Sequence, residues 1–143
     1  MHAPKPLSVG EDPKWKQCRG IFEWDGFRRD VYVLESAPGD WAPAIQWLRS
    51  WADSCRLLGV DGSIEIPDEP ASLVARGRND PTFLLEARKA GICFNCHFFT
   101  DDEIEFDFDP REVDDEPAFG VVLDLLRGLA IATKKEAYLT PEN

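Results

Sequence analysis

Residues 101–116, DDEIEFDFDPREVDDE, constrain the fold more than any other stretch of the chain, because acidic and apolar side chains alternate within it. The apolar members of the alternation are Ile104, Phe106 and Phe108, and the acidic members are Glu103, Glu105, Asp107 and Asp109. Strict alternation of this kind predicts a β-strand with one buried face and one polar face. The four carboxylates, which we call the acidic stripe, should then follow one another on a single face at intervals of about 6.7 Å.

The acidic stripe has three interpretations. A solvated outer face is the commonest origin of such a pattern in antiparallel sheets. A docking face for a basic protein is the second, because concentrated negative charge steers and orients such partners. A divalent-metal site is the third, although the stretch lacks the glycine-punctuated ligand loop of a calcium-binding hand.

Other stretches also predict strands. In residues 19–35, Asp25-Gly26 lies between two apolar-rich runs and predicts a hairpin turn, which would place Arg29 opposite Phe22 on an apolar face. This hairpin is the first pair of strands in the predicted order.

Four more segments complete the predicted sheet. Residues 63–66 predict a short strand, and residues 136–139 predict a final one. Residues 81–89 are compatible with a helix or a strand, but the alternation of apolar and polar side chains favours a strand. This strand would continue through a turn into residues 92–99, which alternate in the same way.

Two helices are predicted. In residues 40–58, Asp40 is a suitable N-cap, Gly59 a suitable stop, and apolar residues recur every three or four positions. Trp47 lies on the flank of that apolar stripe. A second helix runs from Pro117 to Thr133, with acidic residues before it and lysines after it, as the helix dipole favours.

The order of these elements indicates an α+β fold, with a largely antiparallel sheet of about six or seven strands and two main helices packed on one face. A length of 143 residues indicates one domain. Residues 1–14 are rich in proline and are expected to be a poorly ordered lead-in, and residues 15–143 form the single α+β domain.

The charge excludes several kinds of partner. The chain has 16 basic and 27 acidic residues, a net charge of −11, and this field repels phosphate backbones and anionic membranes. We therefore expect no nucleic-acid binding and no membrane association. Residues 1–16 contain no apolar run typical of a signal peptide, so a cytoplasmic protein with free thiols is expected.

Cys93, Cys96 and His97 have the C-x-x-C-H spacing of haem attachment in c-type cytochromes. In a strand over residues 92–99 the two thiols would point to opposite faces, so they could share neither a haem edge nor a zinc ion. We therefore expect no haem and no metal at this motif, and we interpret the cysteines as strand residues.

Arg29, Tyr32 and His97 are the candidate ligand-binding residues. A guanidinium on an apolar face must pair with an acceptor or lie at an edge, and the alternative to a structural pair is an anion-binding pocket with Tyr32 or His97 nearby. Trp47 is a candidate contact for a protein partner, because tryptophan is enriched in interface hot spots.

No phosphate loop, nucleophile elbow, catalytic triad or metal-ligand cluster is recognisable, so we expect a non-catalytic protein without a cofactor. In size, charge and α+β pattern the chain resembles small acidic bacterial immunity proteins, which bind and neutralise a toxin domain. The resemblance implies a basic partner that docks on the acidic stripe, with Trp47 as an aromatic contact. The alternative is a small-ligand or divalent-metal site near Arg29, His97, Asp107 and Asp109.

Overall fold

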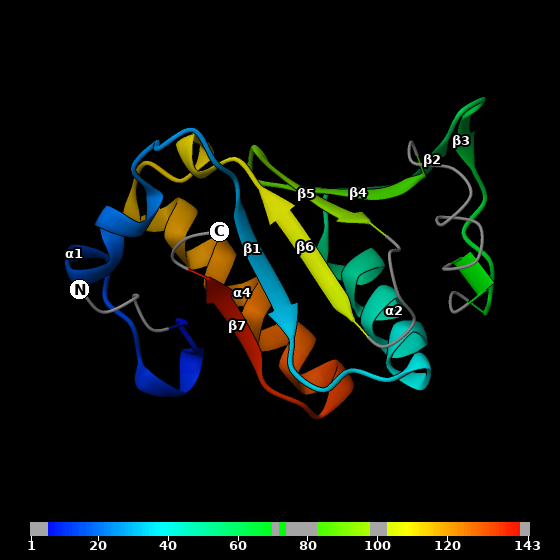
Figure 1. Ribbon diagram of the computed structural model, residues 1–143, viewed down its shortest axis with the longest axis horizontal. Helices are drawn as coiled ribbons and strands as arrows, with labels where there is room; N and C mark the ends of the chain where they lie inside the picture. Colours follow the sequence, from blue (N-terminus) through cyan, green and yellow to red (C-terminus); the bar gives the residue numbers. More distant parts are fainter. Residues whose placement is uncertain (1–5, 70–71, 74–82, 98–102, 141–143) are drawn as a thin grey trace.

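The computed structural model describes residues 6–69, 72–73, 83–97 and 103–140, and its centre is a seven-stranded sheet (Figure 1). The strand order is β3-β2-β4-β5-β6-β1-β7, and all neighbouring strands are antiparallel. The strands are β1 (Arg29–Val33), β2 (Ser54–Gly59), β3 (Gly62–Ile64), β4 (Leu84–Lys89), β5 (Ile92–His97), β6 (Ile104–Phe108) and β7 (Ala137–Thr140). The sheet confirms the predicted α+β class.

Two long helices lie on one face of this sheet. Helices α2 (Trp41–Trp51) and α4 (Glu116–Thr133) run behind the strands in Figure 1, and they also pack against each other. The short helix α1 (Trp15–Cys18) and a 3-10 helix (Arg19–Phe22) lie at the left-hand end. Within the described ranges no helix covers the other face, which points towards the viewer in Figure 1 and which we call the open face.

The core fills the space between the sheet and the two helices. Alternate side chains of β5 and β6, such as Phe94 and Phe106, are buried there together with Trp41 and Leu48 of α2. The residues between them in each strand are only partly buried. The alternation read from the sequence of residues 103–109 is therefore confirmed as a two-faced strand in the middle of the sheet.

Helix α4 forms as predicted. Its N-cap is Asp115, whose side chain accepts a hydrogen bond from the backbone N–H of Ala118 at 2.9 Å, and Pro117 occupies the first turn. The helix ends at Thr133, and the next residue, Lys134, adopts the left-handed conformation at φ 59°. The strand after it, β7, pairs with β1 in the same sheet.

The first predicted helix is shorter than expected. It ends at Trp51 and not near Gly59, because Ala52 is extended (ψ 150°) and the N–H of Asp53 donates to the carbonyl of Arg88. Residues Ser54–Gly59 then form β2, paired with β4. The periodicity that continued past Trp51 suited a helix, but pairing with a strand 30 residues later in the chain decided the conformation.

The predicted hairpin at Asp25-Gly26 is wrong. The chain does turn there, with Gly26 at φ 94°, but Arg19–Phe22 form a 3-10 helix and β1 pairs with β6 and β7. Phe22 packs between Phe108 and Phe119 instead of lying across from Arg29. Local turn chemistry was read correctly, whereas the partner of β1 is set by contacts distant in sequence.

The ambiguity over residues 81–89 is resolved in favour of a strand for Leu84–Lys89. The turn into β5 uses Ala90 at φ 50° and Gly91 at φ 86°, and it pairs Lys89 with Ile92. Residues 81–82 and 98–102, which include the rest of two predicted strands and the turn at Asp101-Asp102, lie outside the described residues. Near the start of the chain, Leu7 forms an antiparallel bridge with Leu139 of β7.

Candidate functional site

The open face of the sheet carries a row of polar side chains that crosses six strands. The pairing registers place the members directly opposite one another in the order Arg56, Glu86, Asn95, Asp107, Asp30 and Thr140. Cross-strand partners of this kind lie about 4.5–5.5 Å apart at Cβ, so each side chain acts on its neighbours. The open face is thus an electrostatically coupled surface, and it contains three of the four residues of the acidic stripe with Glu103 at its border.

Asp107, at the centre of the row, is well compensated. Its carboxylate accepts hydrogen bonds from Arg28 Nε at 2.7 Å and Asn95 Nδ2 at 3.4 Å, and it lies 3.1 Å from His97 Nε2. Burial by itself raises the pKa of Asp107, but the hydrogen bond with His97 and the charge of Arg28 outweigh it, so the pKa lies below its ordinary value. Asp107 and His97 are therefore brought together, as the sequence allowed.

Glu86, further along the row, is compensated in the same way. Arg56 Nη2 and Arg88 Nε bind one of its carboxylate oxygens at 3.0 and 3.1 Å. These hydrogen bonds hold the pKa of Glu86 below its ordinary value, the Arg56 bond having the largest effect. On the half of the open face formed by β2, β4 and β5, the carboxylate of Glu86 is therefore neutralised by arginine side chains, and we call this the compensated half.

Asp30 and Glu105, on the adjacent strands β1 and β6, are different. Both are half-buried, and no ion pair joins either to a Lys, Arg or His side chain within the described part of the chain. Burial and the nearby charge of Asp107 raise the pKa of Asp30. Burial, the charge of Asp30 and the neighbouring Glu103 raise the pKa of Glu105 to about 7.

The two carboxyl groups also interact directly. Asp30 is hydrogen-bonded to the Glu105 side chain, an interaction that favours its ionised form. With its pKa raised to about 7 by burial, by the charge of Asp30 and by its hydrogen bond with Glu103, Glu105 gives up its proton less readily than an ordinary glutamate. We call Asp30 and Glu105 the carboxyl pair.

An aromatic pair borders the carboxyl pair. Tyr32 lies directly opposite both Glu105 of β6 and Tyr138 of β7. The two tyrosine rings stack with centroids 5.7 Å apart and planes inclined by 24°. Tyr32, predicted as a ligand-binding residue, is thus next to the acidic stripe and not next to Arg29.

Asp109, at the end of the stripe, has a structural role. Both of its oxygens bind Arg111, with the shortest contact 2.8 Å to Nη2, and its Oδ1 also accepts from the backbone N–H of Arg111. These contacts cap the 3-10 helix Pro110–Glu112 and keep the pKa of Asp109 low. The Arg111 guanidinium in turn lies 3.8 Å from the centre of the Trp24 ring.

Arg29 lies on the other face of β1 and is not part of this site. Its side chain is 2% exposed, and it donates to the carbonyl oxygens of Ile21, Glu23 and Phe27 at 2.7–2.8 Å and to Asp25 at 3.0 Å. These contacts use the guanidinium to hold residues 21–27 in place. The structure therefore does not bring Arg29 together with His97 and Asp107, which the small-ligand alternative required.

Trp47 is also away from the open face. It stacks on Trp51 at 5.1 Å and packs against Gly128 of α4, where an added Cβ would lie 1.7 Å from its ring. Trp47 is an inter-helix packing residue in this structure. Its flank position in the helix was read correctly, but the sequence did not reveal that a glycine on the second helix receives the ring.

The two cysteines of the C-x-x-C-H motif lie in β5 and point to opposite faces of the sheet. Cys96 is buried and Cys93 lies on the open face, where its Sγ is 3.6 Å from Asn95 Oδ1. Burial raises the pKa of both thiols, so both are protonated at neutral pH. Across residues 6–69, 72–73, 83–97 and 103–140, no group of three or more His, Cys, Asp or Glu side chains is arranged to hold a metal ion.

Asp30 and Arg28 were not identified from the sequence as candidate site residues. Asp30 alternates with Arg29 and Val31, which placed it on the outer face, but its nearest carboxylates lie on a strand 75 residues later. Only the pairing of β1 with β6 reveals that it shares a site with Glu105. One feature of the sequence could have drawn attention to Asp30: it is the one acidic residue in the segment 29–33, which is otherwise apolar or basic.

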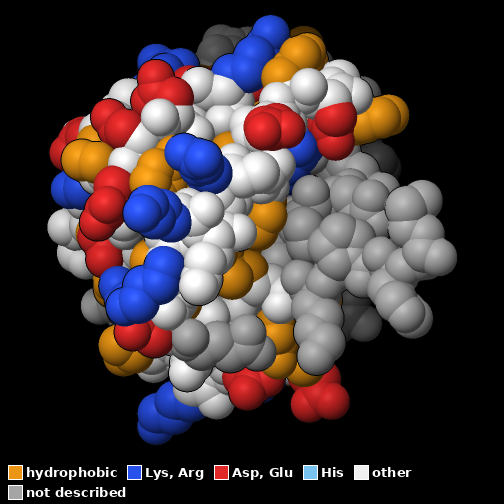
Figure 2. Space-filling view, turned by 90° about the vertical axis from the view of Figure 1, so that its left-hand side faces the viewer, with side chains coloured by type: hydrophobic (Ala, Val, Ile, Leu, Met, Phe, Trp, Pro, Cys, Tyr) orange, Lys and Arg blue, Asp and Glu red, His pale blue; other side chains and the backbone are white. Residues whose placement is uncertain are grey.

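Comparison with family models, curated proteins and solved structures finds no match to this chain, so its function is inferred from the geometry. No described helix is long and apolar enough to cross a membrane. At the α1 end of the molecule, Lys and Arg side chains form a band bordered by Asp and Glu side chains (Figure 2). That end has mixed charge, in contrast to the acidic centre of the open face.

Proposed function

We propose that the protein is a non-catalytic binding protein of the immunity or inhibitor type, whose open face docks a basic protein partner. The observation that carries the proposal is the carboxyl pair. Two half-buried carboxyl groups, which form no ion pair among the described residues, lie on the uncovered face of the sheet in a chain of net charge −11. Such an arrangement costs free energy in the unbound protein, because neighbouring carboxylates repel each other in a partly desolvated site.

A lysine or arginine side chain of the partner would remove that cost. Its positive charge would pair with Asp30 and Glu105, and Glu105 would release its proton as the pair ionised fully. The ring of Tyr32 beside the pair can stack on a guanidinium or ammonium group. Asp107 contributes less, because Arg28 and His97 already occupy its carboxylate.

The surrounding surface suits a protein partner better than a small ligand. The open face is broad, and its polar row extends over six strands. The compensated half around Glu86 supplies arginine–carboxylate pairs of the kind that form the polar rim of an interface. The acidic centre would then select a partner with positive charge, and the ion pairs around it would orient that partner.

The test is affinity capture from the cell that makes the protein, followed by binding measurements with the purified partner. The baits are the wild type, the double variant Asp30→Asn/Glu105→Gln, and a matched control, Asp61→Asn/Asp124→Asn. The control removes the same number of charges at exposed positions away from the open face. The amides preserve the shapes of the carboxyl groups, and thermal melts check that all three proteins are folded.

A basic protein that is retained by the wild type and the control but lost by the open-face variant supports the proposal. Its affinity should fall by at least about 10-fold in the open-face variant and should weaken as the salt concentration rises. Equal retention by all three baits, or retention of nothing, would remove the support for a docking role of the carboxyl pair.

A further inference from the structure

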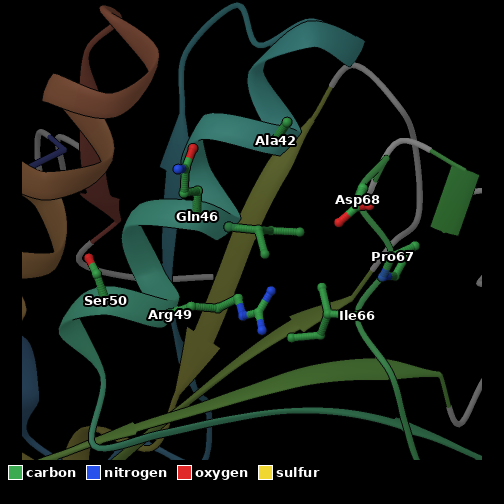
Figure 3. Close-up of a pocket in the computed structure, with 8 residues that line it drawn as sticks. Ala42, Gln46, Arg49, Ser50, Ile66, Pro67 and Asp68 are labelled. Carbon is green, nitrogen blue, oxygen red and sulfur yellow. The ribbon is translucent and has the colours of Figure 1, made fainter.

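A separate pocket of about 590 Å³ lies between helix α2 and the segment that follows β3 (Figure 3). This volume lies within the range of small-molecule sites. Helix α2 contributes Ile45, Gln46 and Arg49, and the segment after β3 contributes Ile66, Pro67 and Asp68. The pocket is on the helix side of the sheet and shares no residue with the open face.

The lining follows from the sequence of α2. Arg49 follows Gln46 by three positions and Ile45 by four, so it shares a side of the helix with each of them. Ile45 is also buried against the core, so it forms the floor of the pocket, whereas Gln46 and Arg49 are exposed. Ile66 and Pro67 are partly buried and close the opposite wall.

Two opposite charges face this space without partners. Figure 3 shows the Arg49 side chain extending from α2 towards Ile66, and the Asp68 carboxylate on the far side directed into the space between them. Among the described residues, neither side chain makes a hydrogen bond or ion pair, and the two do not pair with each other. The other arginines that contact the sheet, such as Arg28 and Arg56, are bound to carboxylates.

We propose that this pocket binds a small zwitterion, namely an α-amino acid with an apolar side chain. The carboxylate of the ligand would pair with Arg49, and its ammonium group with Asp68. Its side chain would lie on Ile45 and Ile66, and the Gln46 amide can donate to or accept from either polar group. A simple anion is a poorer fit, because the Asp68 carboxylate would repel it.

The experiment is an NMR titration of the full chain with three probes of similar shape. L-Leucine carries both charges, 4-methylpentanoate lacks the ammonium group, and 3-methylbutylamine lacks the carboxylate. Leucine is expected to shift the amide signals of Gln46, Arg49 and Ile66 in a saturable way, with a Kd of about 0.1–1 mM. Each analogue should bind at least about 10-fold more weakly, because one of the two charge pairs with the pocket is missing.

Variants locate the binding. Arg49→Gln and Asp68→Asn should each weaken leucine binding by at least about 10-fold, whereas the matched controls Arg127→Gln and Asp61→Asn, at exposed positions outside the pocket, should leave it unchanged. Arg49 and Asp68 are exposed, so both variants are expected to fold, and their thermal melts check this. Because no residue is shared with the carboxyl pair, this outcome is independent of partner docking.

Three results would overturn the proposal. One is the absence of saturable shifts at the pocket with leucine up to about ten times the expected Kd. Another is equal binding of leucine and 4-methylpentanoate, which would indicate a site for anions. The third is leucine binding that survives both Arg49→Gln and Asp68→Asn, since the two charges would then have no part in recognition.

Discussion

The two faces of the central strands differ in how their charged side chains are compensated. On the helix-covered face, Arg29 is buried and donates four hydrogen bonds of 3.0 Å or less to its own preceding loop. On the open face, its neighbour Asp30 is half-buried beside a second carboxyl group and forms no ion pair among the described residues. The buried charge of Arg29 is thus satisfied within the protein, whereas the carboxyl pair on the open face lacks an ion pair among the described residues.

The largest expected effect that tests this contrast is the replacement of Arg29. Arg29→Met removes the guanidinium and leaves the carbonyl oxygens of Ile21, Glu23 and Phe27 without their donor, which should lower the free energy of unfolding by about 3–5 kcal/mol. The matched control is Arg28→Met on the open face, with an expected loss of about 1 kcal/mol or less. Urea denaturation of the two variants measures both, and equal losses would contradict the division between the faces.

The second effect concerns the contact between the helices. Gly128→Ala would place a methyl group 1.7 Å from the Trp47 ring, so the helices must separate, and we expect a loss of about 2–4 kcal/mol. Gly120 lies in the same helix with nothing within 4 Å of an added Cβ. Gly120→Ala should therefore stabilise the protein by about 0.5–1 kcal/mol through helix propensity. Thermal denaturation measures both changes in stability. If both variants were stabilised, or both destabilised, the packing of Trp47 against Gly128 would not explain the result.

The third effect concerns the compensated carboxylate of Asp107 on the open face. Asp107→Asn removes the charge that Arg28 and His97 share, and we expect a loss of about 1–2 kcal/mol at pH 7. The pKa of Asp107 is lower in the folded state than in the unfolded state. Its stabilisation is therefore complete above the unfolded-state pKa and is lost as the pH falls through the folded-state value. The difference between wild type and variant should shrink on acidification, and a difference independent of pH would show that the ion pairs contribute nothing.

The smallest effect has the opposite sign and concerns the carboxyl pair. The pKa of Glu105 is raised to about 7 in the folded protein, so between about pH 4.5 and 7 the folded state binds more protons than the unfolded state, and stability falls as the pH rises. Glu105→Gln cannot ionise and should lack this fall. At pH 8 it should be more stable than the wild type by about 1 kcal/mol, a value reduced for the partial exposure of the group.

Chemical denaturation at several pH values between 4 and 8 measures this difference, and Glu103→Gln at the exposed border of the stripe is the control, with a smaller change expected. If the wild type and Glu105→Gln have parallel stability profiles, the carboxyl pair is not strained in the unbound protein. The proposal of a basic partner would then lose its main physical argument.

Much of the fold followed from local pattern. The alternation in residues 103–109 and 92–97 identified β5 and β6 and the face on which each side chain lies, because the side chains of a strand alternate with a two-residue period. For β4 the same pattern favoured a strand over a helix, and the structure confirms the strand. Helix α4 was also predicted from local sequence, namely the acidic residues before it and the lysines after it. The opposite orientations of Cys93 and Cys96, which argue against a shared haem or zinc site, were determined in the same way.

Tertiary structure decided which strands are neighbours. Nothing near Trp51 required the helix to end there, but pairing with β4 converted Ser54–Gly59 into a strand. Nothing near Asp30 indicated that β1 would insert between β6 and β7. Register between distant strands depends on the global packing of the sheet against its helices, which no local pattern encodes.

The same distinction holds for the sites. Sequence by itself determined that Glu105 and Asp107 share the polar face of a strand, because that is a property of one segment. Only the neighbouring strands made them different: β1 placed Asp30 beside Glu105, whereas Arg28 and His97 came to lie against Asp107. A carboxyl group's charge state depends on burial and on the charges within a few ångströms, and those neighbours are assembled by the tertiary fold.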